Sequence, residues 1–198
     1  MSTLHVENLK GLSSGSNANK IIVPSGQTLD ASGGTLVPSA GHIVQVKQTV
    51  VTNTFSTTIG PGFSEMTDFQ TNITPSSSSN KILIKGSLYV GQNYWQTRGR
   101  ILRDSTAIGL GETAGNRTPV TWNNNTYDGS SNTQYVMNSI SFEFLDSPST
   151  TSQITYSLDL GGYSTSYPVY LNRPHTDNNT STYYGRPIST LTLMEIAA

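Results

Sequence analysis

The side chains that most often do chemistry are scarce in this chain and do not converge. The histidines are His5, His42 and His175, and only His175 has a carboxylate close by, at Asp177 in the segment RPHTDNN. A metal site needs three or four ligands that meet at one point. The sequence also contains no cysteine, so a thiol nucleophile is excluded. We therefore expect no bound metal and no cofactor.

Carboxylates offer a second possible chemistry, because a glycosidase places two of them across a cleft. Asp104, Asp146 and Asp159 lie at the ends of expected strands, where capping a turn is the simpler role. A small β-sandwich, the fold argued below, leaves little room for a deep cleft. We expect that the protein is not an enzyme. An enzyme that degrades surface polysaccharide is the alternative from a different class.

Aromatic side chains flanked by Asn, Gln, Ser and Thr point to binding instead. They occur in the segments GQNYWQ, TWNNNTYDG, GGYSTSYP and STYYG. Aromatic faces cover the apolar faces of sugars or side chains, while amides and hydroxyls supply directional hydrogen bonds. Such segments are expected to be loops, where recognition usually takes place; the alternative is that some rings close the sandwich or pack between subunits. The candidate receptor-contact residues are Tyr94, Trp95, Trp122, Tyr127, Tyr163, Tyr167, Tyr183 and Tyr184.

The segments between these loops have the pattern of β-strands. KILIKGSLYV, QYVMNSISFEFLD and QITYSLDL alternate apolar and polar residues, as half-buried strands do. No segment of helical length repeats apolar residues at helical spacing. Further strands are expected at residues 42–52, 65–73, 97–104, 167–172 and 188–196. The sequence therefore predicts an all-β chain with a jelly-roll β-sandwich head over residues 42–198.

The last expected strand, in ISTLTLMEIAA, has apolar residues on both faces. Leu191 and Leu193 share one face, while Ile188, Met194 and Ile196 share the other. A strand that is apolar on both faces is covered on both. One cover is the sandwich core, and a neighbouring subunit is the simplest second cover. We expect Ile188, Met194 and Ile196 to lie in the interface of a homotrimer.

Residues 1–41 combine turn formers with isolated apolar residues, as in VPSGQTLDASGGTLVPSAG. These residues are too few to form a core within one chain. Three copies around one axis could cover each other, which would place Leu29 and Leu36 in the trimer interface. We therefore expect an extended stem that trimerises and attaches to other proteins. The alternative is a flexible linker, of which Gly and Ser are typical.

The charge balance and the absence of targeting signals limit the partners. Lys and Arg number 11 and Asp and Glu 12, for a net charge of −1, which offers no field for gripping a nucleic acid. No window approaches the apolar length of a membrane helix, and the first residues lack a signal-peptide pattern. We expect a protein made in a cytoplasm, with neither a nucleic-acid partner nor membrane insertion.

Several segments resemble a family of structural proteins encoded by tailed phages of marine bacteria. They include KIIVPSGQTLDASGGTLVPSAGHIVQV, ITPSSSSNKILIKGSL, RILRDSTAIGLGE, FEFLDSPSTTSQITYSLDL and STLTLMEIAA, and together they cover nearly the whole chain. Members of that family are described as tail-fibre or virion proteins. The C-terminal part is also similar, in architecture alone, to the trimeric jelly rolls of the complement-type head and tumour-necrosis-factor families.

The resemblance implies a place in the virion and a role as a tail fibre or fibre-like appendage. The stem would then bind other virion proteins, and the head would bind a host cell-surface glycan or protein. The alternative within the same class is a protein that decorates the capsid or tail, with loops that bind other virion proteins.

Overall fold

The computed structural model describes residues 9–11, 13–16, 18, 20–30, 38–92, 95–125, 134–180 and 184–198. The chain divides into two compact units, Met1–Val37 and Pro38–Ala198. The described residues of the first unit form turns and irregular chain without helix or strand. Leu29 is 70% exposed there, and Leu36 lies outside the described residues.

The second unit begins a few residues earlier than the expected head. The backbone N–H of Gly41 donates to the carbonyl of Ala197 at 2.8 Å, and the N–H of Ala197 donates to the carbonyl of His42 at 2.9 Å. These bonds tie residues 41 and 42 to the end of the last strand. Residues 38–41 therefore group with the sandwich and not with the N-terminal segment.

The second unit is built from β-strands, and the described residues contain no α-helix, so the expected all-β class is confirmed. The strands are β1 (Ile43–Val51), β2 (Phe55–Thr57), β3 (Ser64–Ile73), β4 (Lys81–Gln92), β5 (Gln96–Arg103), β6 (Thr106–Ile108), β7 (Trp122–Asn125), β8 (Met137–Asp146), β9 (Ile154–Gly161), β10 (Val169–Leu171) and β11 (Ser189–Ile196).

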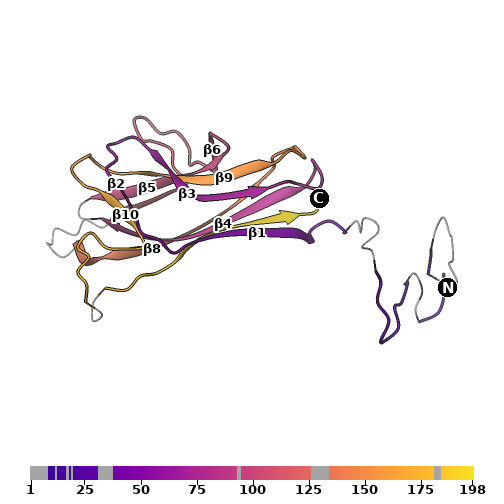
Figure 1. The fold of residues 1–198 in the computed structure, drawn as a ribbon. Helices are drawn as coiled ribbons and strands as arrows, with labels where there is room; N and C mark the ends of the chain where they lie inside the picture. Colours follow the sequence, from indigo (N-terminus) through magenta and orange to yellow (C-terminus); the bar gives the residue numbers. More distant parts are fainter. Residues whose placement is uncertain are drawn as a thin grey trace. The chain divides into compact units, whose positions relative to one another are not determined.

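Two antiparallel sheets form the layers of a sandwich (Figure 1). The first sheet has the order β1-β11-β4-β10-β2, and β8 pairs with the other edge of β4. The second has the order β3-β9-β5-β6, and β7 also pairs with β5. Consecutive long strands repeatedly cross from one sheet to the other, so β1, β4, β8 and β11 form one layer and β3, β5, β7 and β9 the other. This strand order is that of a jelly-roll β-sandwich.

The core lies between the two sheets and follows the alternation along each strand. In β4, Ile82, Ile84 and Leu88 are 0% exposed, and Gly86 shares their face. The ring of Phe142, on the neighbouring β8, fills the space beside Gly86, because a Cβ there would lie 2.1 Å from a ring carbon. Each fully buried aliphatic side chain stabilises the fold by about 1.5 to 3 kcal/mol.

The two ends of the sandwich differ. The β4–β5, β7–β8, β9–β10 and β10–β11 connections are the richest in aromatic residues. The strand ends that they join lie at one end of the sandwich, which we name the loop end. The register places them there, because Gln92, Met137 and Gly161 all lie at the same ends of their paired strands. At the opposite end, β1 begins beside the end of β11, with Ile43 paired to Ile196. We name this the terminal end (Figure 1).

A buried carboxylate closes the terminal end. Glu195 points inward from β11 and is 0% exposed. Its Oε1 accepts hydrogen bonds from the N–H and hydroxyl of Ser76, each at 2.7 Å, and from the amide of Asn80 at 2.6 Å, while its Oε2 accepts one from the Gln45 amide at 2.6 Å. Burial raises the pKa of Glu195, but these hydrogen bonds outweigh burial and hold the pKa below its usual value. The carboxylate thus joins β11 to β1 and to the β3–β4 connection.

Candidate functional site

Two aromatic pairs lie at the loop end, and each joins two different loops. Trp95, between β4 and β5, stacks on Tyr163, between β9 and β10, with ring centroids 4.9 Å apart and planes at 25°. Tyr135, before β8, lies 6.5 Å from Tyr184, before β11, with planes at 51°. Tyr163 and Tyr135 are 46% and 49% exposed. The loops therefore present partly exposed ring faces to the outside.

The backbone at Trp95 is held in an unusual conformation by its neighbours. Trp95 has φ of 66°, and the left-handed region costs a residue other than glycine about 1–2 kcal/mol. The buried amide of Gln92 donates to the Trp95 carbonyl and accepts from the hydroxyl of Thr97. These bonds, together with the stacking on Tyr163, fix the ring at the loop end.

The structure separates the expected contact residues into three groups. Trp95, Tyr163 and Tyr184 lie at the loop end, and Tyr167 is half-buried there, with its N–H bonded to the carbonyl of Ser164 at 3.1 Å. The expected contacts Tyr94, Tyr127 and Tyr183 lie outside the described residues.

Trp122 forms the third group, because it is partly buried against the core and lies in a strand. It lies in β7, paired with Gly99 of β5, and its ring packs against the core. A Cβ at Gly99 would meet that ring at 2.4 Å. The expectation that Trp122 stands in an exposed loop is therefore corrected: the ring fills the space that Gly99 leaves open.

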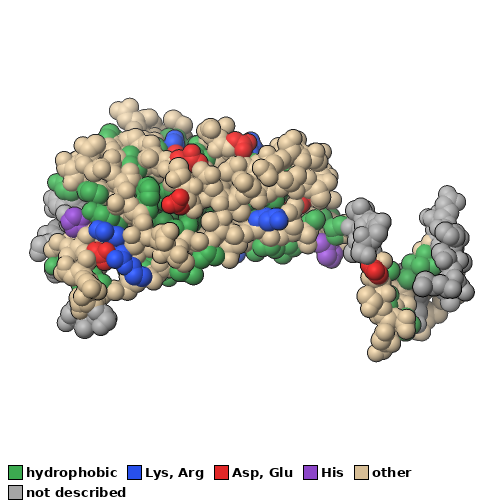
Figure 2. All heavy atoms as spheres, viewed as in Figure 1, with side chains coloured by type: hydrophobic (Ala, Val, Ile, Leu, Met, Phe, Trp, Pro, Cys, Tyr) green, Lys and Arg blue, Asp and Glu red, His purple; other side chains and the backbone are tan. Residues whose placement is uncertain are grey.

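A cluster of charged residues lies beside the second aromatic pair. Asp177 Oδ2 accepts a hydrogen bond from Arg186 Nη2 at 2.5 Å and lies 3.6 Å from Arg173 Nη1. Arg173 also lies over the ring of Tyr170, 4.4 Å from its centroid, and that phenol is 2.9 Å from Nδ1 of His175. Figure 2 shows blue, red and purple side chains next to one another at this end of the sandwich.

The surroundings of His175 disfavour the charged form of its imidazole. Burial lowers its pKa, and the positive charge of Arg173 lowers it further. Two guanidinium groups face one carboxylate, Asp177, so the arginines exceed the carboxylate by one positive charge.

A cleft of about 340 Å³ opens next to this cluster. Its volume falls at the small end of the range for small-molecule sites. The lining combines a carboxylate, a guanidinium, amides, a hydroxyl and one aromatic ring. These residues are Asp177, Asn178, Asn179, Thr180, Tyr184 and Arg186, and we name this site the Asp177 cleft.

The outer face of the first sheet is a second candidate surface. One row of residues crosses it through the register: Val46 pairs with Met194, Met194 with Leu83, and Leu83 with Leu145. All four are apolar, and Val46 and Leu145 are 52% and 47% exposed. We name this the apolar row.

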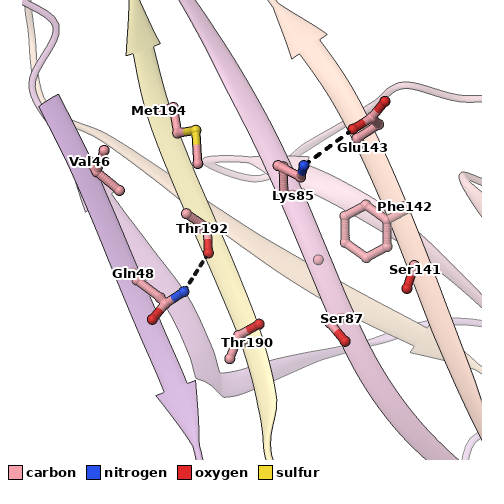
Figure 3. A pocket seen from close by; sticks show the side chains of 11 residues that line it. Val46, Gln48, Lys85, Ser87, Ser141, Phe142, Glu143, Thr190, Thr192 and Met194 are labelled. Carbon is pink, nitrogen blue, oxygen red and sulfur yellow. Dashed lines mark hydrogen bonds and ion pairs between the residues drawn. The ribbon is translucent and has the colours of Figure 1, made fainter. Parts of the chain in front are cut away.

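A polar row runs next to the apolar row. Gln48 donates to the hydroxyl of Thr192 at 2.7 Å, and Lys85 lies 3.6 Å from Glu143. The polar row, together with Val46 and Met194 of the apolar row, lines a broad hollow of about 780 Å³ on this face (Figure 3). Figure 3 also shows Met194 on the outward side of β11.

Three of the five residues expected in a trimer interface belong to β11 or directly precede it, whereas Leu29 and Leu36 belong to the N-terminal unit. Met194 and Ile196 point outward from β11 and are half-buried, and Ile188, just before the strand, is 52% exposed. Leu191 and Leu193, on the opposite face, are 0% exposed. The described part of this chain leaves the outer face of β11 only partly covered.

The carboxylates at strand ends are engaged within the fold. Asp146 binds Arg103 at 3.1 Å and accepts a hydrogen bond from the Tyr156 phenol at 2.6 Å. Asp159 lies 2.5 Å from Arg100, and Asp104 accepts a bond from the N–H of Thr155 at 3.0 Å. Among the described residues no group of three or more potential metal ligands occurs. No helix in the described part of the chain is long and apolar enough to cross a membrane.

The fold defines a class, the jelly-roll β-sandwich, and the comparisons with known proteins add the following. No family model matches the sequence, and no curated protein is significantly similar to it. Among solved structures, a chain of infectious bursal disease virus, Gt strain, aligns with a TM-score of 0.39 and 14% identity, over 89% of this chain and 43% of that one. A chain of the T13 viral particle of the same virus aligns with a TM-score of 0.41 and 15% identity, over 89% of this chain and 40% of that one. A chain of its VP2 subviral particle aligns with a TM-score of 0.36 and 13% identity, over 79% of this chain and 38% of that one.

This chain thus spans less than half the length of those viral chains. At these scores and identities the likeness does not assign the chain to their group.

Proposed function

We propose that this protein is a virion structural protein whose sandwich is the head of a homotrimeric tail fibre or fibre-like appendage. The head attaches to the host surface through its loop end, and the N-terminal unit binds other virion proteins. The observation that carries the proposal is the difference between the two ends of the sandwich. The aromatic pairs and the Asp177 cleft lie at the loop end, whereas the chain enters the sandwich at the terminal end, at residues 38–43.

This arrangement suits an appendage, because a protein anchored through its N-terminal unit leaves the loop end of its sandwich available to bind a host surface. Loops on a rigid β-sandwich are a common place for recognition. Partly exposed Tyr and Trp rings next to amides and hydroxyls supply contact area at low cost in side-chain entropy. The sequence resemblance to structural proteins of tailed phages supports the same role.

The homotrimer is supported by the outer face of the first sheet. The apolar row crosses four adjacent strands without a polar residue, and a contiguous exposed apolar surface often marks a protein interface. The adjacent polar row would fix how the subunits align in such an interface, since Lys85 and Glu143 would each favour an opposite charge on the neighbouring subunit and repel a like one. The role we propose for the protein is binding and assembly, not catalysis.

Competition for host cells tests the attachment role directly. Purified full-length protein should occupy receptors and slow adsorption of intact virus particles in a concentration-dependent manner. The variant Tyr184→Ala should compete less well, while Leu110→Ala, which changes an exposed residue of the β6–β7 connection, should compete like the unchanged protein. Protein that does not slow adsorption at saturating concentration, with antibody label on the capsid of intact particles, would contradict the proposal and favour a decorating role.

A further inference from the structure

The Asp177 cleft has an unsatisfied requirement for negative charge. The same oxygen of Asp177 faces both guanidinium groups, Arg186 at 2.5 Å and Arg173 at 3.6 Å. The Asp177 side chain is 14% exposed, so it serves both cations from a largely buried position. One carboxylate balances one of the two charges. A second anion at this place would therefore be favoured.

Arg186 is the cation that can reach such an anion. Its side chain is 51% exposed and lines the cleft, whereas that of Arg173 is 26% exposed. Within the described part of the chain, Arg186 donates one hydrogen bond, from Nη2 to Asp177. A guanidinium has five N–H donors in a planar fork that matches a carboxylate. Arg173, in contrast, donates hydrogen bonds to the backbone carbonyls of Pro174 and His175 in addition to its ion pair with Asp177.

The remaining lining fits a sugar ring. Asn178, Asn179 and Thr180 offer amides and a hydroxyl, which donate and accept hydrogen bonds as sugar hydroxyls do. Tyr184 adds an aromatic face, and the ring of Tyr135 supports Tyr184 from outside the cleft lining, tilted by 51° with its centroid 6.5 Å away. A pyranose presents both an apolar face and a rim of hydroxyls, which these two kinds of group complement.

We propose that the Asp177 cleft binds a carboxylate-bearing sugar, with the carboxylate on Arg186 and the ring against Tyr184. The biological meaning of this ligand rests on the attachment function proposed above, but the binding itself is a separate property of the cleft. An inorganic anion fits less well. The excess of a single positive charge is small for phosphate, and neither the amides nor the aromatic face would be used.

A matched pair of sugars tests the ligand class. Methyl β-D-glucuronide and methyl β-D-glucoside differ only in that the first has a carboxylate where the second has a hydroxymethyl group. Binding of each to the full-length protein is measured by titration calorimetry and by saturation-transfer NMR, with inorganic phosphate as a third probe. We expect the glucuronide to bind at least about tenfold more tightly than the glucoside, a difference of about 1.4 kcal/mol. Phosphate should bind more weakly than the glucuronide.

Three variants locate the binding. Arg186→Gln should reduce glucuronide affinity about tenfold or more and leave glucoside affinity nearly unchanged. Tyr184→Ala should weaken both sugars by a similar factor, because the ring face does not distinguish them. Arg117→Gln is the matched control, since it removes an exposed arginine of the β6–β7 connection, remote from the cleft lining. Each variant is compared with the unchanged protein by its melting temperature before binding is measured.

Equal affinity for the two sugars, tighter binding of phosphate than of glucuronide, or unchanged glucuronide affinity in a folded Arg186→Gln protein would each overturn the proposal. Adsorption measurements separate it from the attachment function. Protein that competes for host cells but does not bind glucuronide would refute the cleft proposal alone. Protein that binds glucuronide through Arg186 but does not compete for host cells would support the cleft proposal and refute the attachment function.

Discussion

Replacing Glu195 with glutamine should destabilise the sandwich, although the two side chains have nearly the same shape. A glutamine keeps one oxygen for Ser76 and Asn80 but places an NH2 group against the Gln45 amide, which donates to Glu195 at 2.6 Å. Gln45 cannot simply turn over, because its amide also donates to the carbonyl of Thr74 at 2.8 Å. The variant therefore loses one hydrogen bond, sets two donors against each other and weakens the remaining bonds.

The magnitude follows from the kind of bond that is lost. A hydrogen bond to a charged group contributes about 1.5–3 kcal/mol, compared with about 0.5–1.5 kcal/mol for a neutral one. Glutamine costs less to bury than a carboxylate, which offsets part of the loss. We expect a net loss of about 2 kcal/mol. For a folded unit of this size, that corresponds to a decrease of about 4–8 °C in melting temperature.

The measurement is thermal and urea unfolding of both proteins at one protomer concentration, because assembly would make stability depend on concentration. Glu112→Gln is the control. It removes an exposed carboxylate of the β6–β7 connection and should change stability by no more than about 0.5 kcal/mol. A Glu195→Gln protein that melts with the unchanged protein at pH 7 would refute the assigned role of the carboxylate.

The pH dependence gives a second readout. The pKa of Glu195 is lowered in the folded state. Its contribution to stability is therefore fully present above the pKa of a glutamate in the unfolded chain, about 4.3. The contribution is lost as the pH falls through the folded pKa, because the unfolded state then binds the proton first. The difference in free energy of unfolding between the unchanged protein and Glu195→Gln should therefore become smaller below about pH 4. A difference that stays constant from pH 7 to pH 3 would contradict this account.

The remaining predictions concern assembly and the loop end. Met194→Asp should convert the proposed trimer to a monomer near 21.3 kDa by light scattering, because the apolar row would acquire buried carboxylates. Met194→Leu should not, and an intact Met194→Asp trimer would remove β11 from the proposed interface. Trp122→Ala should cost about 3–5 kcal/mol of stability because the ring packs against the core, whereas Tyr184→Ala should keep the melting temperature and weaken adsorption by about thirtyfold. The opposite pattern would exchange the roles of the two rings. Deleting residues 1–37 should leave a folded sandwich that no longer joins virions, since the bonds of Gly41 to Ala197 remain; normal incorporation would place the anchor within the sandwich.

The sequence predicted the long strands well, because their signal is local. In β4 and β11 the alternation of apolar and polar residues places Ile82, Ile84, Leu191 and Leu193 inside, as expected. The short strands β2, β6 and β7 gave no such signal. The WNNN segment of β7 has the composition of a loop and becomes a strand through its pairing with β5.

The features that sequence reasoning missed depend on partners distant in the chain. Trp122 is partly buried against the core because Gly99 leaves a space on the adjacent strand. Tyr135 joins the loop end because Tyr184 lies next to it, and Glu195 occupies an inward position because Ser76 and Asn80 surround it with donors. The expected aromatic segments located the loop end. The Asp177 cleft is local by contrast, because Asp177 and Arg186 both lie within the β10–β11 connection, but no residue pattern there signals that the chain folds back to bring them together.

The position of β1 determines how the sandwich carries mechanical load. The N-terminal unit is joined to the sandwich at the terminal end, where β1 begins, and β1 is paired along its length with β11, from Ile43–Ile196 to Val51–Ser189. A pull between the N-terminal unit and anything held at the loop end acts parallel to these strands. The backbone hydrogen bonds between them are perpendicular to the strands, so such a pull shears all of them at once. A pull across the strands would open them one at a time and at a much lower force.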